Sequence, residues 1–144
     1  MRRRFILSEI GGFLGWLTVI AYAGTMLNFV LKVVNKKYGK NISSHPDGKK
    51  LMSILMKVFV RQHRYWGFAA VLFLLLHFLM QFSQFGISIT GVIAATILIL
   101  QIGLGMYGAY LHKKRAGAWF WVHRFIATLL ILGIVIHLLF TALI

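Results

Sequence analysis

The sequence predicts an all-α membrane protein, a bundle of four transmembrane helices that forms a single domain over residues 1–144. Three observations support this fold class. Of the 144 residues, 60% are hydrophobic and only 12% are charged, a composition that leaves too few polar side chains to cover a soluble domain. Four apolar stretches each reach the roughly 20 residues that a helix needs to cross a bilayer. The positive charges gather at the ends of these stretches.

The four predicted spans follow one another with short connections. They cover residues of about 10–31, 58–80, 87–111 and 118–144. The connection at about 35–50 is polar and contains the only proline, Pro46, so we expect a loop there. Residues 51–61 are apolar with two positive charges, which fits either an early start of the second helix or an amphipathic turn at the membrane surface. Residues 81–88 are expected to form a short uncharged turn.

Lysine and arginine are unevenly divided between the two ends of this predicted bundle. Thirteen lie in the first and third connecting loops or at the adjacent ends of the spans, and three lie at the N-terminus, at positions 2–4. The positive-inside rule therefore places the loops between spans 1 and 2 and between spans 3 and 4 in the cytoplasm. We expect an integral protein of a prokaryotic cytoplasmic membrane. Its basic clusters would contact lipid headgroups rather than nucleic acid.

The absence of cysteine and the scarcity of carboxylates exclude several kinds of chemistry. Without cysteine the chain cannot form disulfides, thiolate zinc sites, cysteine-ligated iron–sulfur clusters or covalently attached c-type haem. Glu9 and Asp47 are the only acidic residues, which argues against a paired-carboxylate hydrolase and a carboxylate metal cage. The GxGxxG pattern at residues 103–108 lies inside an apolar span and lacks the preceding strand that a dinucleotide site needs.

An internal repeat carries the predicted chemistry. The pattern His-Arg-x12-His occurs from His63 to His77 in the second span and from His123 to His137 in the fourth, at a constant offset of 60 residues. Fourteen helical residues turn through about 1400°, close to four full turns, so both histidines of a span lie on one face, about 21 Å apart. The two spans run in the same direction because one antiparallel span separates them. The inner couple is then His63 with His123, near the cytoplasm, and the outer couple is His77 with His137.

These paired imidazoles predict two b-type haems between the second and fourth helices. Each couple offers nitrogen ligands from opposite sides of a gap, as bis-histidine ligation requires. Four residues after the first histidine of each helix stands a small residue, Gly67 or Ala127, which leaves room for a flat macrocycle. Arg64 and Arg124 are candidates for binding the inner propionates. A single intramembrane histidine is usually a hydrogen-bonded packing residue, but four in register indicate a functional site.

The two His-Arg-x12-His helices resemble the transmembrane core of ferric reductases and NADPH oxidases, in which two helices each supply two histidines to two stacked b haems. The resemblance implies axial-ligand roles for the matching residues, which are His63, His77, His123 and His137. It also implies electron transfer across the membrane. The small membrane cytochrome b subunits of respiratory complexes, which pass electrons between a partner protein and quinone, are similar in architecture.

We expect the chain to act as an electron-transfer cytochrome b or oxidoreductase subunit. Electrons would pass from a cytoplasmic reductant or quinol to an acceptor on the opposite side, with a redox partner protein or quinone and within a homo- or hetero-oligomer. One alternative is a quinone-reactive cytochrome b anchor subunit of a larger complex. An alternative of another class is a histidine-lined cation transporter, although such paths usually contain intramembrane carboxylates.

Several further residues have open roles. Gln101 in the third span fits an interhelical hydrogen bond better than a contact with quinone or haem, and His45 and His112 fit solvated or interfacial positions. Glycines recur in the first and third spans, where we expect close helix–helix or helix–haem packing. These glycines are Gly11, Gly12, Gly15, Gly91, Gly103 and Gly105.

Overall fold

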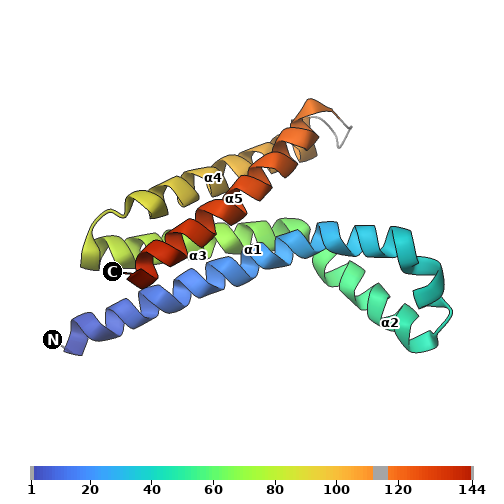
Figure 1. Cartoon of the computed structure of the whole chain (residues 1–144), viewed down its shortest axis with the longest axis horizontal. Helices are drawn as coiled ribbons and strands as arrows, with labels where there is room; N and C mark the ends of the chain where they lie inside the picture. Colours follow the sequence, from blue (N-terminus) through green and yellow to red (C-terminus); the bar gives the residue numbers. More distant parts are fainter. Residues whose placement is uncertain (1, 112–116, 144) are drawn as a thin grey trace. The chain divides into compact units, whose positions relative to one another are not determined.

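The computed structural model describes residues 2–111 and 117–143, with side chains for 7–111 and 117–141, and this part of the chain is almost entirely helical. The elements, labelled in Figure 1 where space allows, are α1 (Arg2–Ser43), α2 (Pro46–Leu55), the π-helical segment η1 (Met56–Arg61), α3 (His63–Phe85), α4 (Ile89–Met106), the π-helical segment η2 (Tyr107–Leu111) and α5 (Ala118–Leu143). Four helical stretches are long and apolar enough to span a membrane: Leu7–Ser43, His63–Phe85, Ile89–Leu111 and Ala118–Thr141. The prediction of an all-helical protein with four such helices is confirmed.

The helices form two compact units. The first, called the α1–α3 unit, comprises residues 9–77 and contains most of α1, all of α2 and η1, and α3 as far as His77. The second, called the α4–α5 unit, comprises the residues up to 8 and those from 78 onward. The two copies of the histidine repeat are therefore divided between the units, one copy in each.

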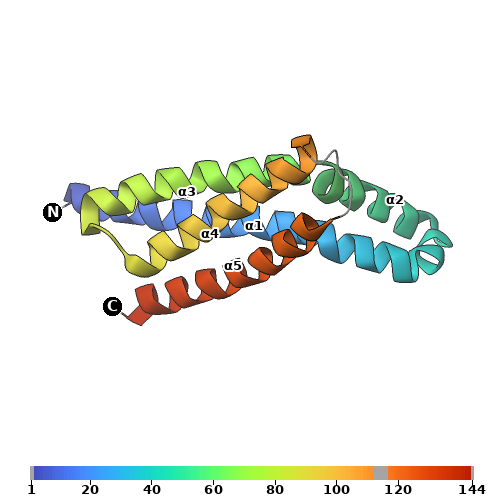
Figure 2. The ribbon, with the colours of Figure 1, turned by 90° about the horizontal axis from the view of Figure 1, so that it is seen from above.

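The first helix is much longer than the predicted first span. Figures 1 and 2 show α1 as one unbroken helix, and its 42 residues extend about 63 Å, twice the roughly 30 Å of a bilayer core. The prediction of a loop over residues 35–50 is wrong, because polar side chains alone do not end a helix. The helix ends at Ser43 instead. Pro46 disfavours helical geometry in the residue before it, and His45 is extended (φ −104°, ψ 129°).

The region before the second span is helical but separate from it. Residues 51–61 form the end of α2 and all of η1, and a break at Gln62 (φ −95°, ψ 16°) precedes α3. Pro46 begins α2, where its missing N–H costs no helical hydrogen bond, and Asp47 suits the positive end of the helix dipole. The first histidine of the repeat thus begins a new helix directly after an irregular segment.

A short turn separates α3 from α4. Gly86 adopts φ 79°, a left-handed geometry that ends α3 and that residues with a Cβ rarely adopt. Ser88 caps α4, because its Oγ accepts a hydrogen bond of 3.3 Å from the backbone N–H of Gly91. The predicted turn over 81–88 is therefore present but covers only residues 86–88, since α3 continues to Phe85.

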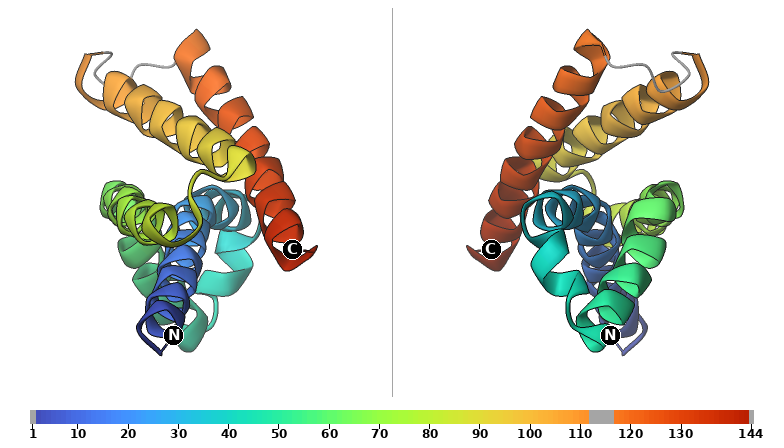
Figure 3. Two further views of the ribbon diagram at one scale, coloured as in Figure 1. Left: turned by 90° about the vertical axis from the view of Figure 1, so that its left-hand side faces the viewer. Right: turned by 90° about the vertical axis from the view of Figure 1, so that its right-hand side faces the viewer.

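In the second unit, α4 and α5 lie side by side in opposite directions, as Figures 1 and 2 show and Figure 3 shows from the two ends. Small residues bring the two backbones close together. A Cβ added at Gly133 of α5 would lie 3.8 Å from the Cα of Ala94 on α4. Near the other end of the pair, the ring of Trp119 covers Gly108 so closely that a Cβ there would overlap it. These contacts extend along both helices and hold the histidines of α5 against α4.

In the first unit, Trp66 fixes the start of α3 against η1 and α1. Its indole Nε1 donates a 3.0 Å hydrogen bond to the carbonyl of Val58, and its ring stacks on Phe59 with centroids 5.4 Å apart. Gly24 of α1 lies beneath the ring, where an added Cβ would be 2.6 Å from an indole carbon. The three contacts orient the first turn of α3, which carries His63.

We predict that Gly24→Ala destabilises the protein by about 1–3 kcal/mol, because the new methyl group collides with Trp66 and the packed ring must move. Gly12→Ala is the matched control on the same helix, since a Cβ at Gly12 has no described neighbour within 4 Å. The measurement is the unfolding midpoint in mixed detergent micelles. Equal midpoints for the two variants would contradict the proposed packing of Trp66 on Gly24.

Candidate functional site: four intramembrane histidines

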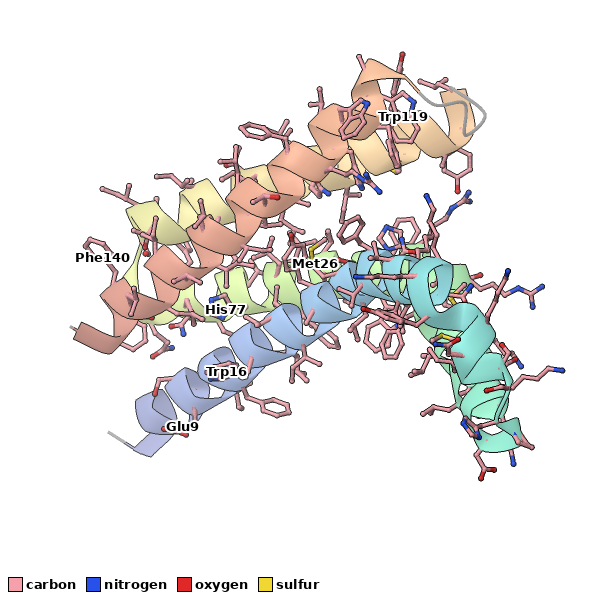
Figure 4. All side chains as sticks on the ribbon, turned by 45° about the vertical axis from the view of Figure 1, so that its right-hand side comes forward. Glu9, Trp16, Met26, His77, Trp119 and Phe140 are labelled. Atoms are coloured by element: carbon pink, nitrogen blue, oxygen red, sulfur yellow. The ribbon has the colours of Figure 1, made fainter. Side chains whose placement is uncertain are left out.

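His77, labelled in Figure 4, is held by the backbone of the neighbouring helix in its unit. Its Nδ1 lies 2.8 Å from the carbonyl oxygen of Gly11 on α1. A carbonyl oxygen only accepts, so the ring donates Nδ1–H, and in a neutral imidazole Nε2 is then the nitrogen with the lone pair. Gly15, one turn further along α1, faces the same ring, and an added Cβ would lie 3.0 Å from its Cε1. The absence of a Cβ at Gly15 lets the ring approach α1 this closely.

His137 is held in a comparable way by α4, but through hydroxyl groups. Its Nδ1 lies 3.1 Å from Thr90 Oγ1, which lies 3.2 Å from Ser88 Oγ. When the hydrogen bonds run from His137 to Thr90 to Ser88, Nδ1 is the donor and Nε2 carries the lone pair. Gly91 lies beside the ring, since an added Cβ would be 3.2 Å from Cε1. The two outer histidines therefore share a bond through Nδ1 and a glycine on the supporting helix.

His123 also packs on α4 but uses its other nitrogen. The Nε2 atom of its ring lies 3.2 Å from Nε2 of Gln101, a side chain that is only 6% exposed. Gly105 lies beside the ring, where an added Cβ would be 3.4 Å from Cε1, and the Trp119 ring centroid lies 6.4 Å away. The interhelical hydrogen bond predicted for Gln101 is thus confirmed, and its partner is one of the four repeat histidines.

His63 is half-buried on the first turn of α3 and precedes Trp66 by three residues. The contacts of Trp66 with Val58 and Gly24 fix the backbone of that turn. The position of this histidine therefore depends on the junction between η1 and α3. The rings of the other three repeat histidines contact a neighbouring helix directly.

The other predicted site residues lie on the expected helices in different surroundings. The exposed guanidinium of Arg124 stacks 4.4 Å from the ring centroid of Phe120, on its own helix. Arg64 is exposed on the first turn of α3. A Cβ added at Gly67 would have no described atom within 4 Å, whereas Ala127 is buried at 5% exposure. Gly67 therefore has open space around it, whereas Ala127 does not.

The sequence contains two further histidines, His45 and His112. His45 is exposed between α1 and α2, as expected, and its side chain makes no capping bond. His112 lies outside the residues that the structure describes. Within residues 7–111 and 117–141, no group of three or more histidine or acidic side chains lies close enough to hold a metal ion. Bis-histidine ligation of haem needs only two protein ligands, one on each side of the ring.

Sequence reasoning missed the partners that hold the histidines. Thr90 was not singled out, although it stands at the start of an apolar helix where a hydroxyl can bond across to another helix. Trp66 was not recognised as the residue that orients the start of α3. The glycines were singled out for close packing, and this is confirmed where they face histidine rings, at Gly15, Gly91 and Gly105. At Gly12 and Gly103 no described atom lies within 4 Å of an added Cβ.

We predict that Thr90→Val destabilises the α4–α5 unit by about 1 kcal/mol, because it removes the hydroxyl bonded to His137. Thr96→Val is the matched control, since that exposed hydroxyl bonds only to the carbonyl of Val92 on its own helix. The unfolding midpoint in detergent and the ¹⁵N chemical shift of His137 Nδ1 are the two measurements. An unchanged nitrogen shift in Thr90→Val would contradict the bond to His137.

Comparison with protein-family models, curated proteins and solved structures found no match to the chain. The candidate site therefore rests on the repeated histidines and on the contacts that hold their rings.

Proposed function

We propose that the protein is a membrane cytochrome b that binds two b-type haems through its four repeat histidines and transfers electrons across the bilayer. The observation that carries the proposal is the hydrogen bond from His77 Nδ1 to the carbonyl of Gly11. A metal-ligating histidine typically donates its second ring nitrogen to a carbonyl, carboxylate or water, which fixes the ring and directs the other nitrogen to the metal. His137, bonded through Nδ1 to Thr90, supports the same role.

The pairing of the ligands rests on the sequence register. The constant offset of 60 residues matches His63 with His123 and His77 with His137, on two spans expected to run in the same direction. The protein's part is to position the imidazoles, surround them with apolar side chains and place positive charge near the inner couple. The haems would supply the one-electron chemistry itself. About 21 Å of helix rise between the two couples suits a pathway through a core about 30 Å thick.

The distribution of charge indicates which side of the membrane each haem of the expected circuit faces. The basic segments before α3 and before α5 favour the cytoplasmic side for the inner couple. Electrons would enter there from a flavoprotein or from quinol. They would leave on the opposite side to ferric iron, another cytochrome or a partner subunit. A role as the quinone-reactive anchor of a larger oxidoreductase uses the same two haems and differs only in the partners.

We predict that the purified protein has a Soret band and, when reduced, a b-type α-band at two haems per chain. Alanine at His63 or His123 should abolish one haem, and alanine at His77 or His137 should abolish the other, because each site needs both of its ligands. Pyridine haemochrome analysis measures the stoichiometry. A colourless protein that binds zinc would favour cation transport instead. A colourless protein that binds neither would indicate a membrane anchor without a redox role.

We predict a higher reduction potential for the inner haem, because nearby positive charge stabilises the reduced state. The difference should be on the order of tens of millivolts. Potentiometry of His77→Ala and His63→Ala isolates the inner and the outer haem respectively. Arg124→Gln should lower the inner potential, whereas Arg3→Gln, at the N-terminus, should leave it unchanged. A lower potential at the inner site than at the outer site would overturn this assignment.

A further inference from the structure

Gln101 and His123 form an incompletely satisfied polar pair in the apolar contact between α4 and α5. One contact joins them, between the Nε2 atoms of the two side chains at 3.2 Å. Among the residues that the structure describes, Gln101 Oε1 and His123 Nδ1 are buried and have no hydrogen-bond partner. Buried polar atoms normally have one, and its absence is costly in an apolar environment. Exchanging the hydrogen bond between Gln101 and His123 for a bond to another partner therefore costs little free energy.

The ring atom that Gln101 occupies is the one that would bind iron. An amide can donate its N–H to the lone pair of the imidazole, or accept from a ring N–H after a flip, and both orientations engage His123 Nε2. At the outer histidines, Gly11 and Thr90 instead contact Nδ1 of His77 and His137.

We propose that Gln101 competes with haem iron for His123 Nε2 and thereby weakens haem binding at the inner site. The inference rests on the proposed two-haem function. Gln101 holds the ring of His123 in place before the cofactor arrives and must withdraw when iron binds. The amide is 6% exposed on an apolar helix, so withdrawal breaks a buried hydrogen bond for which nearby aliphatic side chains offer no replacement. Loss of one such bond corresponds to about a tenfold weaker affinity.

The test compares haem binding in two backgrounds of the full chain. His77→Ala with His137→Ala leaves only the inner site, and His63→Ala with His123→Ala leaves only the outer site. Each background is reconstituted as apoprotein in neutral-lipid nanodiscs, with and without Gln101→Leu, and titrated with haem while the Soret band is recorded. Leucine is similar in size to glutamine and suits an apolar span. Thr96→Val, an exposed change on the same helix, is the matched control.

We expect Gln101→Leu to tighten haem binding about tenfold at the inner site and to leave the outer site unchanged, with no effect of Thr96→Val at either site.

Two results would overturn the inference. Inner-site affinity that is unchanged or weaker in Gln101→Leu, while haem still binds, refutes the role of Gln101 and leaves the two-haem function intact. If neither background binds haem, the proposed function fails and this inference fails with it.

Discussion

An imidazole inside a bilayer must find a hydrogen-bond partner on a neighbouring helix, and this constraint governs the packing of the protein. Hydrocarbon offers no partner, so a buried ring nitrogen left unpaired costs free energy that packing must offset. His77 meets the constraint with the carbonyl of Gly11, and His137 meets it with the hydroxyl of Thr90. Each bond requires the supporting helix to come close, which explains the glycines beside the two rings, Gly15 and Gly91.

The same arrangement occurs in both units. A helix that carries the histidine repeat, α3 or α5, packs on one supporting helix, α1 or α4, and the second histidine of the repeat bonds to that support through Nδ1. The partners are chemically different, since a carbonyl fixes the tautomer of the ring whereas a hydroxyl can donate or accept. The repeat in sequence therefore corresponds to a repeat in packing. The hydrogen bond fixes the tautomer of the imidazole in the copy on α3 but not in the copy on α5.

The four histidines are thus not equivalent, although their spacing is the same. His77 and His137 are held through Nδ1, His123 is engaged through Nε2 by Gln101, and the turn of His63 is fixed through Trp66. In a cytochrome of the proposed kind, such contacts orient the ligand rings and adjust their basicity, so they bear on affinity and potential as directly as the ligands do. The polar residues that matter most are those that bond across helices, because helix–helix contacts in lipid gain little from the hydrophobic effect.

The sequence by itself determined the fold class and the ligand candidates. Hydrophobic length sets the number of spans, and helical geometry places histidines fourteen residues apart on one face. Two helix boundaries lie at residues with special backbone preferences, Pro46 and Gly86. The polar composition of residues 35–50, in contrast, wrongly suggested a loop where α1 continues to Ser43. Only the tertiary structure decided which nitrogen of each ring is engaged and by what. Gly11, Thr90 and Gln101 are distant in sequence from the histidines they contact, and no local pattern encodes a contact between helices.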